Sequence, residues 1–173
     1  MTSRRILVAG IGNVFMGDDA FGVAVVRGLF ARPRRQGVTL MDVGIRGIDL
    51  TYALTDGYDA AVLVDAAQRG HAPGTLYVLE PAPASDQAGA LLAAHDLDPA
   101  RVLAAARGFG EIPSIVRIVG CEPAALGTPE EPLFELSAAV TAAIAPAILL
   151  VEELLDELDG PPRVAGAARG AHA

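Results

Sequence analysis

The six residues from Ala60 to Asp65, AAVLVD, constrain the fold of this chain more than any other segment. Five aliphatic residues stand together and a single carboxylate follows them. A strand that is buried on both faces of a sheet has this continuous apolar pattern, whereas a strand with one wet face alternates. The run therefore predicts a central strand in a sheet that helices cover on both sides.

The rest of the chain alternates between strand-like and helix-like segments. Four further runs have the β-branched content of strands: residues 5–9, 38–42, 75–79 and 114–119. Helical patterns are found between and after them, at residues 20–30, 48–54, 98–108 and 137–159. Asp98 followed by Pro99 is a strong helix-start signal, because Asp caps free N–H groups and Pro fits the first helical position. Pro146 is expected to kink or break the last helix.

The connection between the third and fourth strands is short. Only nine residues separate Asp65 from Thr75, and a parallel crossover needs about a dozen or more. The fourth strand is therefore predicted to run antiparallel to the third. The predicted fold is α/β, a three-layer sandwich in which helices cover both faces of a five-stranded, mostly parallel sheet with one antiparallel strand. Residues 1–160 are expected to form a single domain, and residues 161–173 a disordered tail rich in Gly, Ala and Pro.

Composition excludes several classes of function. The net charge of −8 argues against nucleic acid, whose binding requires a concentrated basic surface. No membrane association is expected, because no apolar run approaches the ~20 residues of a spanning helix. The N-terminus lacks the apolar core of a signal peptide, so a cytoplasmic location is predicted. The acidic end of the last helix is compatible with a monomer. The single cysteine, Cys121, is read as a small buried hydrophobic residue.

The turn after the first strand, GIGNVFMGDDAFG at residues 10–22, carries carboxylates. It lacks the third glycine of a dinucleotide-binding loop, and its aspartates would repel a pyrophosphate at the helix start. Nucleotide binding is therefore the weaker reading. Gly10 and Gly12 are expected to let the backbone turn tightly. Asp18 is expected mainly to cap the following helix, which leaves Asp19 free to face the carboxyl edge of the sheet.

Strand-end carboxylates are expected to converge at that edge. Asp42 and Asp65 end the second and third strands, and Asp19 lies in the turn after the first. Three carboxylates buried together are unstable unless they are protonated, paired or bound to a cation. His95 would complete a set of imidazole and carboxylate ligands that suits a first-row divalent metal. His71, in the loop after Asp65, is expected to be a surface residue.

Six segments in the same order connect the chain to a known family. They are residues 10–22, MDVGIRG at 41–47, VLVDA at 62–66, APGT at 72–75, His95 before its helix, and GCEP at 120–123. With these segments the chain resembles the nickel-iron hydrogenase maturation endopeptidases. The resemblance extends over nearly the whole chain, from residue 6 to about residue 158.

The resemblance implies an activity and a set of site residues. The expected enzyme is a peptidase that removes the C-terminal extension of the hydrogenase large-subunit precursor after nickel insertion. By position, Asp19, Asp65 and His95 match the family's metal-binding residues, and the metal is expected to be the nickel of the precursor. Asp19 and Asp42 are the expected catalytic residues. Asp42 matches a further acidic position of the family and is expected to serve precursor recognition or cleavage. The family has Glu or Asp at the first position, and this chain has the shorter Asp.

The chemistry of attack is open between an aspartic-type and a metal-assisted mechanism, in which a carboxylate or a bound metal activates water. Cys121 is a poor candidate nucleophile, because no base is predicted beside it. Two alternatives to the peptidase are kept. One is a nucleotide-binding, Rossmann-like protein. The other is a non-catalytic metal-binding scaffold that docks on the hydrogenase.

Overall fold

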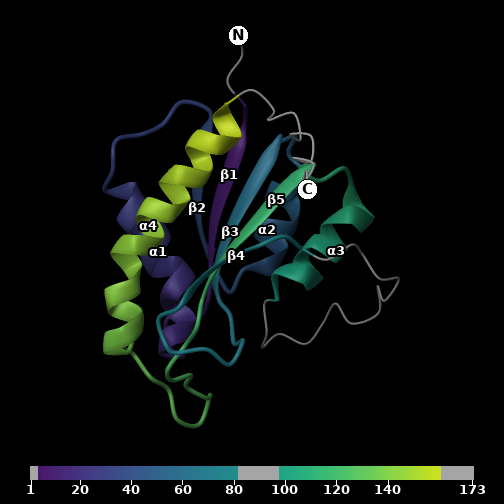
Figure 1. Cartoon of the computed structure of the whole chain (residues 1–173). Coiled ribbons are helices and arrows are strands. Elements are labelled where there is room, and N and C mark those ends of the chain that lie inside the picture. The colour runs from purple at the N-terminus through teal and green to yellow at the C-terminus, as the bar shows by residue number, and fades with distance from the viewer. Residues whose placement is uncertain (1–3, 82–97, 161–173) are drawn as a thin grey trace, which may run out of the picture.

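The computed structural model describes residues 4–81 and 98–160, which contain one five-stranded sheet with helices on both sides (Figure 1). The strands lie in the order β2-β1-β3-β5-β4. Their bounds are Ile6–Ile11 (β1), Val38–Gly44 (β2), Ala60–Ala66 (β3), Leu76–Leu79 (β4) and Ile115–Cys121 (β5). The expected tail at residues 161–173 lies outside the described residues, and the single domain over residues 1–160 stays a prediction.

Strand directions agree with the sequence pattern. Strand β1 pairs in parallel with both β2 and β3, and β3 pairs in parallel with β5. Strand β4 runs antiparallel to its partner β5, which confirms the prediction from the short connection after Asp65. All residues of β3 up to Asp65 are buried. The prediction of a central strand covered on both faces is therefore confirmed.

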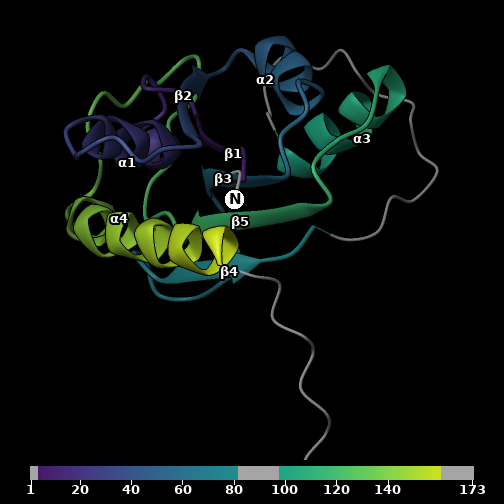
Figure 2. The ribbon, with the colours of Figure 1, turned by 90° about the horizontal axis from the view of Figure 1, so that it is seen from above.

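Within residues 4–81 and 98–160, four α-helices form the outer layers, two on each face of the sheet (Figure 2). Helices α1 (Phe21–Phe30) and α4 (Ala138–Asp159) cover one face, where their apolar side chains share a core with alternate residues of β1 and β3. Helices α2 (Gly47–Leu54) and α3 (Pro99–Phe109) cover the other face and pack on the remaining residues of the same strands. This is the predicted three-layer α/β sandwich.

Helix α1 packs directly against the sheet, because glycines stand where the two layers meet. A Cβ on Gly22 would lie 2.0 Å from the carbonyl oxygen of Val64, and one on Gly10 would lie 2.3 Å from that of Gly22. Gly12 has a φ of 136°, in the region that favours glycine. Gly12 therefore serves the turn, as expected, whereas Gly10 serves the close packing.

Helix α4 continues through Pro146 without the break that the sequence had left open. Pro146 and Ala142, the residue four positions earlier, are both exposed, so the carbonyl that loses its helical partner faces water. By length and composition α4 is apolar enough to cross a membrane, contrary to the expectation that no run was long enough. Its buried side chains belong to the core shared with α1, as in an ordinary core helix.

The helix-start signal at Asp98 is confirmed, and the structure shows a second N-cap at Ser137. Asp98 precedes α3, and its Oδ1 accepts a hydrogen bond from the backbone N–H of Ala100 at 2.9 Å. Ser137 does the same for α4, accepting from the N–H of Val140 at 3.3 Å. Local sequence thus determines where both helices begin.

Candidate active site

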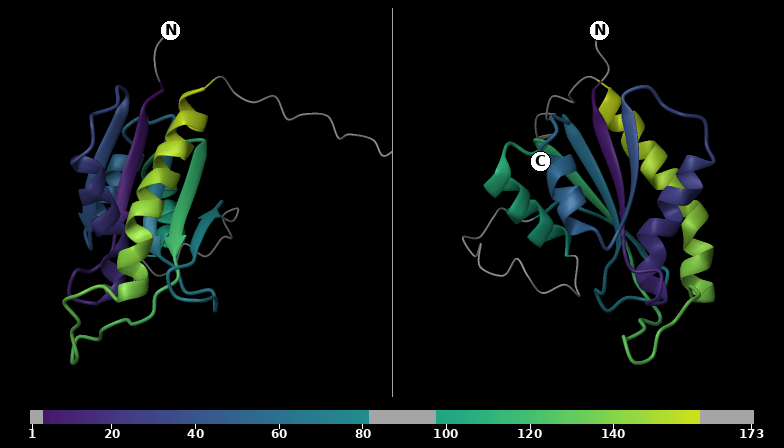
Figure 3. Two further views of the ribbon diagram at one scale, coloured as in Figure 1. Left: turned by 60° about the vertical axis from the view of Figure 1, so that its left-hand side comes forward. Right: turned by 180° about the vertical axis from the view of Figure 1, so that it is seen from behind.

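The carboxyl edge of the sheet collects the turn after β1, the end of β3 and the segment between β5 and α4 (Figure 3). A short 3-10 helix, η1 (Asp18–Ala20), links the turn to α1. Two isolated bridges, Met16 to Leu133 and Gly17 to Leu126, join the turn to the β5–α4 segment. The edge is therefore a connected structure built from residues far apart in the sequence.

Asp19 is held in place by the turn that precedes it. Its Oδ2 accepts a hydrogen bond from the backbone N–H of Asn13 at 2.7 Å. The side chain of Asn13 accepts in turn from the N–H of Phe15 at 3.0 Å. The carboxylate of Asp19 thus takes a backbone donor that a phosphate would use in a nucleotide loop, which argues further against nucleotide binding.

Asp65 lies at the end of β3 and is only 8% exposed. Its Oδ1 accepts a hydrogen bond from the N–H of Ala66 at 2.8 Å. Burial, together with the nearby negative charge of Asp19, holds the pKa of Asp65 well above its usual value. The structure therefore brings Asp19 and Asp65 together at one edge. A cation between them would offset both the cost of burying a negative charge and the repulsion between the two carboxylates.

Asp42 does not join this pair. It lies opposite Gly10 and two residues before the end of β2 at Gly44, not at the strand end that was expected. Its Oδ2 forms an ion pair with Nε of Arg27 on α1 at 3.0 Å. In the described part of the chain, no three His, Cys, Asp or Glu side chains form a group that could hold a metal ion. The expected convergence of three carboxylates is thus not observed among the described residues, where Asp42 is paired with Arg27 instead.

Of the two histidines considered for the site, His71 lies in the described residues and His95 does not. His95, the expected imidazole ligand, lies outside the described residues. His71 is exposed, and its ring centroid lies 5.7 Å from that of Tyr77. The prediction that His71 is a surface residue is confirmed.

Asp18 is fully buried and does not cap a helix. Its Oδ2 accepts from the N–H groups of Ala124 and Ala125 at 2.8 and 2.9 Å, and its Oδ1 accepts from that of Ser137 at 2.6 Å. Burial disfavours the charged form, but these hydrogen bonds outweigh it and lower the pKa of Asp18. The capping prediction is wrong. Asp18 fastens the β5–α4 segment to the turn.

Glu122 is a second structural carboxylate, and sequence reasoning missed it. It is 5% exposed and accepts hydrogen bonds from the Tyr77 hydroxyl at 2.5 Å and from the N–H groups of Arg69 and Gly70 at 2.8 and 3.1 Å. The Tyr77 hydrogen bond is the main reason that the pKa of Glu122 is lowered. Glu122 shapes the loop after Asp65. A charged residue directly after an apolar strand, in the segment GCEP, was the available signal.

Cys121 is inert. It is fully buried, and burial, followed by the charges of Asp18 and Glu122, raises the pKa of its thiol to about 11. Because the thiolate is the nucleophile, a thiol with this pKa is unreactive at neutral pH. The prediction of a buried hydrophobic residue is confirmed.

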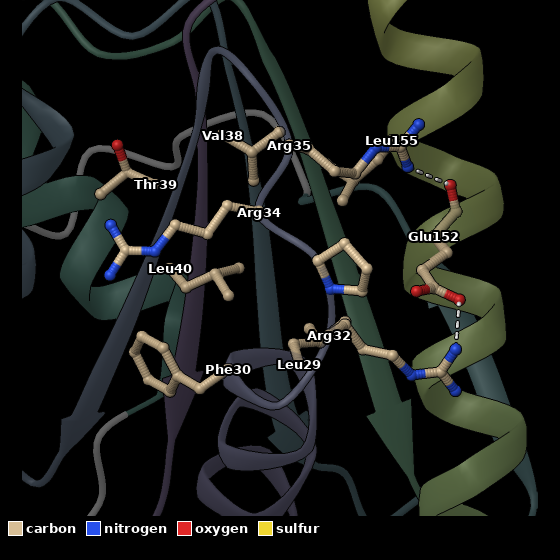
Figure 4. Close-up of a pocket in the computed structure, with 11 residues that line it drawn as sticks. Leu29, Phe30, Arg32, Arg34, Arg35, Val38, Thr39, Leu40, Glu152 and Leu155 are labelled. Atoms are coloured by element: carbon tan, nitrogen blue, oxygen red, sulfur yellow. Dashed lines mark hydrogen bonds and ion pairs between the residues drawn. The ribbon is translucent and has the colours of Figure 1, made fainter.

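A cavity of about 320 Å³ lies at the opposite end of the sheet, beside the start of β2 (Figure 4). Arginines from the α1–β2 connection line it together with residues of α4. Arg32 pairs with Glu152 at 3.6 Å, and Arg35 donates to the backbone carbonyl of Glu152 at 3.1 Å. These contacts attach the connection to α4, remote from the Asp19–Asp65 pair.

Comparison with known proteins points to one family. A family model described as hydrogenase maturation protease matches residues 23–154. The hydrogenase 2 maturation protease of Escherichia coli K12 is 34% identical over 159 residues, which cover 88% of this chain and 92% of that protein. The hydrogenase expression/formation protein HupD of Rhizobium leguminosarum is 34% identical over 121 residues, and this chain covers 69% of its own length but only 59% of that protein.

Solved structures show the same fold. The hydrogenase maturating endopeptidase HybD from E. coli superimposes with a TM-score of 0.70 at 33% identity, over 88% of this chain and 93% of that one. The NiFe hydrogenase maturation protease HycI from Thermococcus kodakarensis KOD1 superimposes with a TM-score of 0.61 at 25% identity, over 91% and 94% of the two chains. The mixed five-stranded sheet is thus an arrangement that these proteins share.

Proposed function

Because the chain belongs to the hydrogenase maturation protease family, we propose that it removes the C-terminal extension of the nickel-iron hydrogenase large-subunit precursor after nickel insertion. The single observation that carries the proposal is the Asp19–Asp65 pair at the carboxyl edge, where α/β proteins place their ligands. The precursor would be the partner of this chain, which acts as a cytoplasmic monomer.

Nickel in the precursor is the proposed recognition signal. Asp65 is buried beside the charge of Asp19, so a divalent cation that approaches this edge gains two carboxylate ligands and removes their repulsion. His95 would add an imidazole, which first-row divalent metals favour. The metal belongs to the substrate, and cleavage is therefore gated by nickel loading.

Peptide hydrolysis would use the carboxylates of this edge. Water adds to the scissile carbonyl carbon, a carboxylate accepts the proton that the water loses, the C–N bond breaks, and the leaving nitrogen takes up a proton. Asp19 and Asp42 are the proposed catalytic residues. The ion pair with Arg27 orients the side chain of Asp42, which would serve precursor recognition or cleavage.

Mass spectrometry of the precursor tests this function. Nickel-loaded precursor should lose the mass of its extension when it is mixed with the protein, and nickel-free precursor should not. Asp19→Asn, Asp65→Asn and His95→Ala variants should cleave slower by roughly 10²-fold or more. Asp56→Asn is the matched control, because Asp56 is 72% exposed and pairs with Arg5 on the surface.

Other outcomes separate the alternatives. Processing at the wild-type rate by all three site variants would show that the site is assigned wrongly. An unchanged mass of nickel-loaded precursor with the wild-type protein would favour a non-catalytic metal-binding scaffold. Saturable binding of NAD or ATP would favour the nucleotide-binding alternative.

A further inference from the structure

Four large apolar side chains are exposed together at the carboxyl edge. They are Phe15 (55% exposed), Leu126 (42%), Leu133 (40%) and Phe134 (70%), and we call them the apolar ridge. The rings of Phe15 and Phe134 meet edge to face, with centroids 6.0 Å apart and an interplanar angle of 82°. Scattered exposed hydrophobic residues are ordinary, but a cluster at one place marks an interaction surface.

The ridge stands on a rigid base. The N–H of Gly17 donates to the carbonyl of Leu133 at 2.7 Å, and the N–H of Leu133 donates to the carbonyl of Phe15 at 3.0 Å. Gly17 has a φ of 63°, and a Cβ there would lie 2.9 Å from the carbonyl oxygen of Ala125. The buried Asp18 adds its three hydrogen bonds to the same segment. A base held in this way lets the ridge side chains bind with little loss of backbone freedom.

The ridge is continuous with the proposed active site. Phe15 and Asp19 belong to one turn, and Asn13 holds both, because its side chain accepts from Phe15 and its N–H donates to Asp19. A polypeptide that binds Phe15 would therefore lie beside the turn that holds Asp19.

The charge around the ridge selects the kind of partner. The same β5–α4 segment exposes Glu130, Glu131 and Glu135, on a chain with a net charge of −8. A second copy of this chain would meet like charge there, whereas a partner with basic residues would be attracted. Residues that dominate binding energy are typically large side chains, often aromatic, at the centre of a surface that polar residues surround.

We propose that the apolar ridge binds an apolar segment of the precursor, flanked by lysine or arginine, and thereby places the cleavage position at Asp19 and Asp65. This proposal rests on the proposed function, and it adds a docking surface that recognises polypeptide independently of nickel. The ridge residues bind and position the substrate and take no part in the chemistry.

Steady-state kinetics with nickel-loaded precursor tests the ridge. The Phe15→Ser/Phe134→Ser variant should raise KM by roughly ten- to thirtyfold, the range for loss of a central aromatic pair, with kcat little changed. Tyr52→Ser/Phe109→Ser is the matched control. These rings also meet on the surface, with centroids 5.8 Å apart and exposures of 59% and 63%, but they lie on α2 and α3. The control should keep the wild-type KM.

The charge argument has its own variant. Glu131→Gln/Glu135→Gln should raise KM at low salt and should lose that effect at high salt, because screening weakens exposed charges. An unchanged KM in the ridge variant would overturn the docking proposal and leave the proposed function standing. A second outcome would also overturn the docking proposal. In it, the wild-type protein self-associates in sedimentation velocity, and the ridge variant loses this self-association but processes the precursor as the wild type does.

A precursor that the wild-type protein does not cleave would refute the proposed function alone. Binding of the same precursor, measured by biolayer interferometry, then tests whether the ridge is a docking surface. Weaker binding by the ridge variant than by the Tyr52/Phe109 control would support it, and equal binding would overturn it.

Discussion

Replacing Asp18 by alanine is expected to reduce stability severely, although Asp18 stands directly beside the proposed site residue Asp19. The change removes the acceptor of three backbone N–H groups, those of Ala124, Ala125 and Ser137. A hydrogen bond to a charged group contributes about 1.5–3 kcal/mol, so a simple sum gives about 4.5–9 kcal/mol.

Two effects reduce that sum. Ala124 and Ala125 are exposed, so water can replace the carboxylate for their N–H groups, and the variant no longer buries a charge. The expected loss is therefore about 3–5 kcal/mol in the free energy of unfolding. For a chain of this size it corresponds to a fall in Tm of about 6–20 °C.

Urea and thermal unfolding, followed by circular dichroism, measure this loss. Asp18→Asn should fall between wild type and Asp18→Ala, because it keeps one of the two accepting oxygens. Asp56→Ala, at a side chain that is 72% exposed, should change stability by less than about 0.5 kcal/mol. A wild-type unfolding midpoint for Asp18→Ala would refute the reasoning. Lost processing with normal stability would instead place Asp18 in the chemistry.

Four further substitutions test contacts of the same fold. Gly22→Ala should lower the free energy of unfolding, measured in urea, by about 3 kcal/mol, because the new Cβ would lie 2.0 Å from the carbonyl oxygen of Val64. Gly108→Ala should stabilise α3, because a Cβ at Gly108 would meet no atom within 4 Å. Asp65→Asn should slow processing by roughly 10²-fold or more yet raise stability at pH 7 by about 1–3 kcal/mol. Because the pKa of Asp65 is raised in the fold, ionisation destabilises the wild type as pH rises, and unfolding at several pH values should show the gain vanish in acid. Glu122→Gln should lower stability at neutral pH. The pKa of Glu122 is lowered, so its stabilisation is present above the usual value of about 4.3 and is lost as pH falls further, and the two proteins should converge in acid unfolding.

Local patterns were sufficient for the elements of the fold. The continuous apolar run at residues 60–65 predicted β3 and its two covered faces, because a strand's own side chains record whether water reaches them. Asp98 marked the start of α3 through contacts within two residues. The nine-residue connection after Asp65 determined the direction of β4, since no parallel crossover fits such a length.

The roles of individual carboxylates depended on distant partners. Asp18 and Asp19 are adjacent in sequence, yet one is buried against residues 124–137 and the other accepts from Asn13. The local rule assigned capping to Asp18 because a residue more than a hundred positions away contributes nothing to local propensity. Asp42 likewise appeared to belong to an acidic cluster until the fold placed Arg27 beside it.

By itself, then, the sequence determined the layers, the strand directions and the edge of the sheet at which the chemistry-bearing residues collect. Only the tertiary structure decided which carboxylate is structural, which is paired with an arginine, and which two repel each other. The physical reason is that secondary structure follows from energies between near neighbours. Burial and charge pairing depend on which distant residues the finished fold brings into contact.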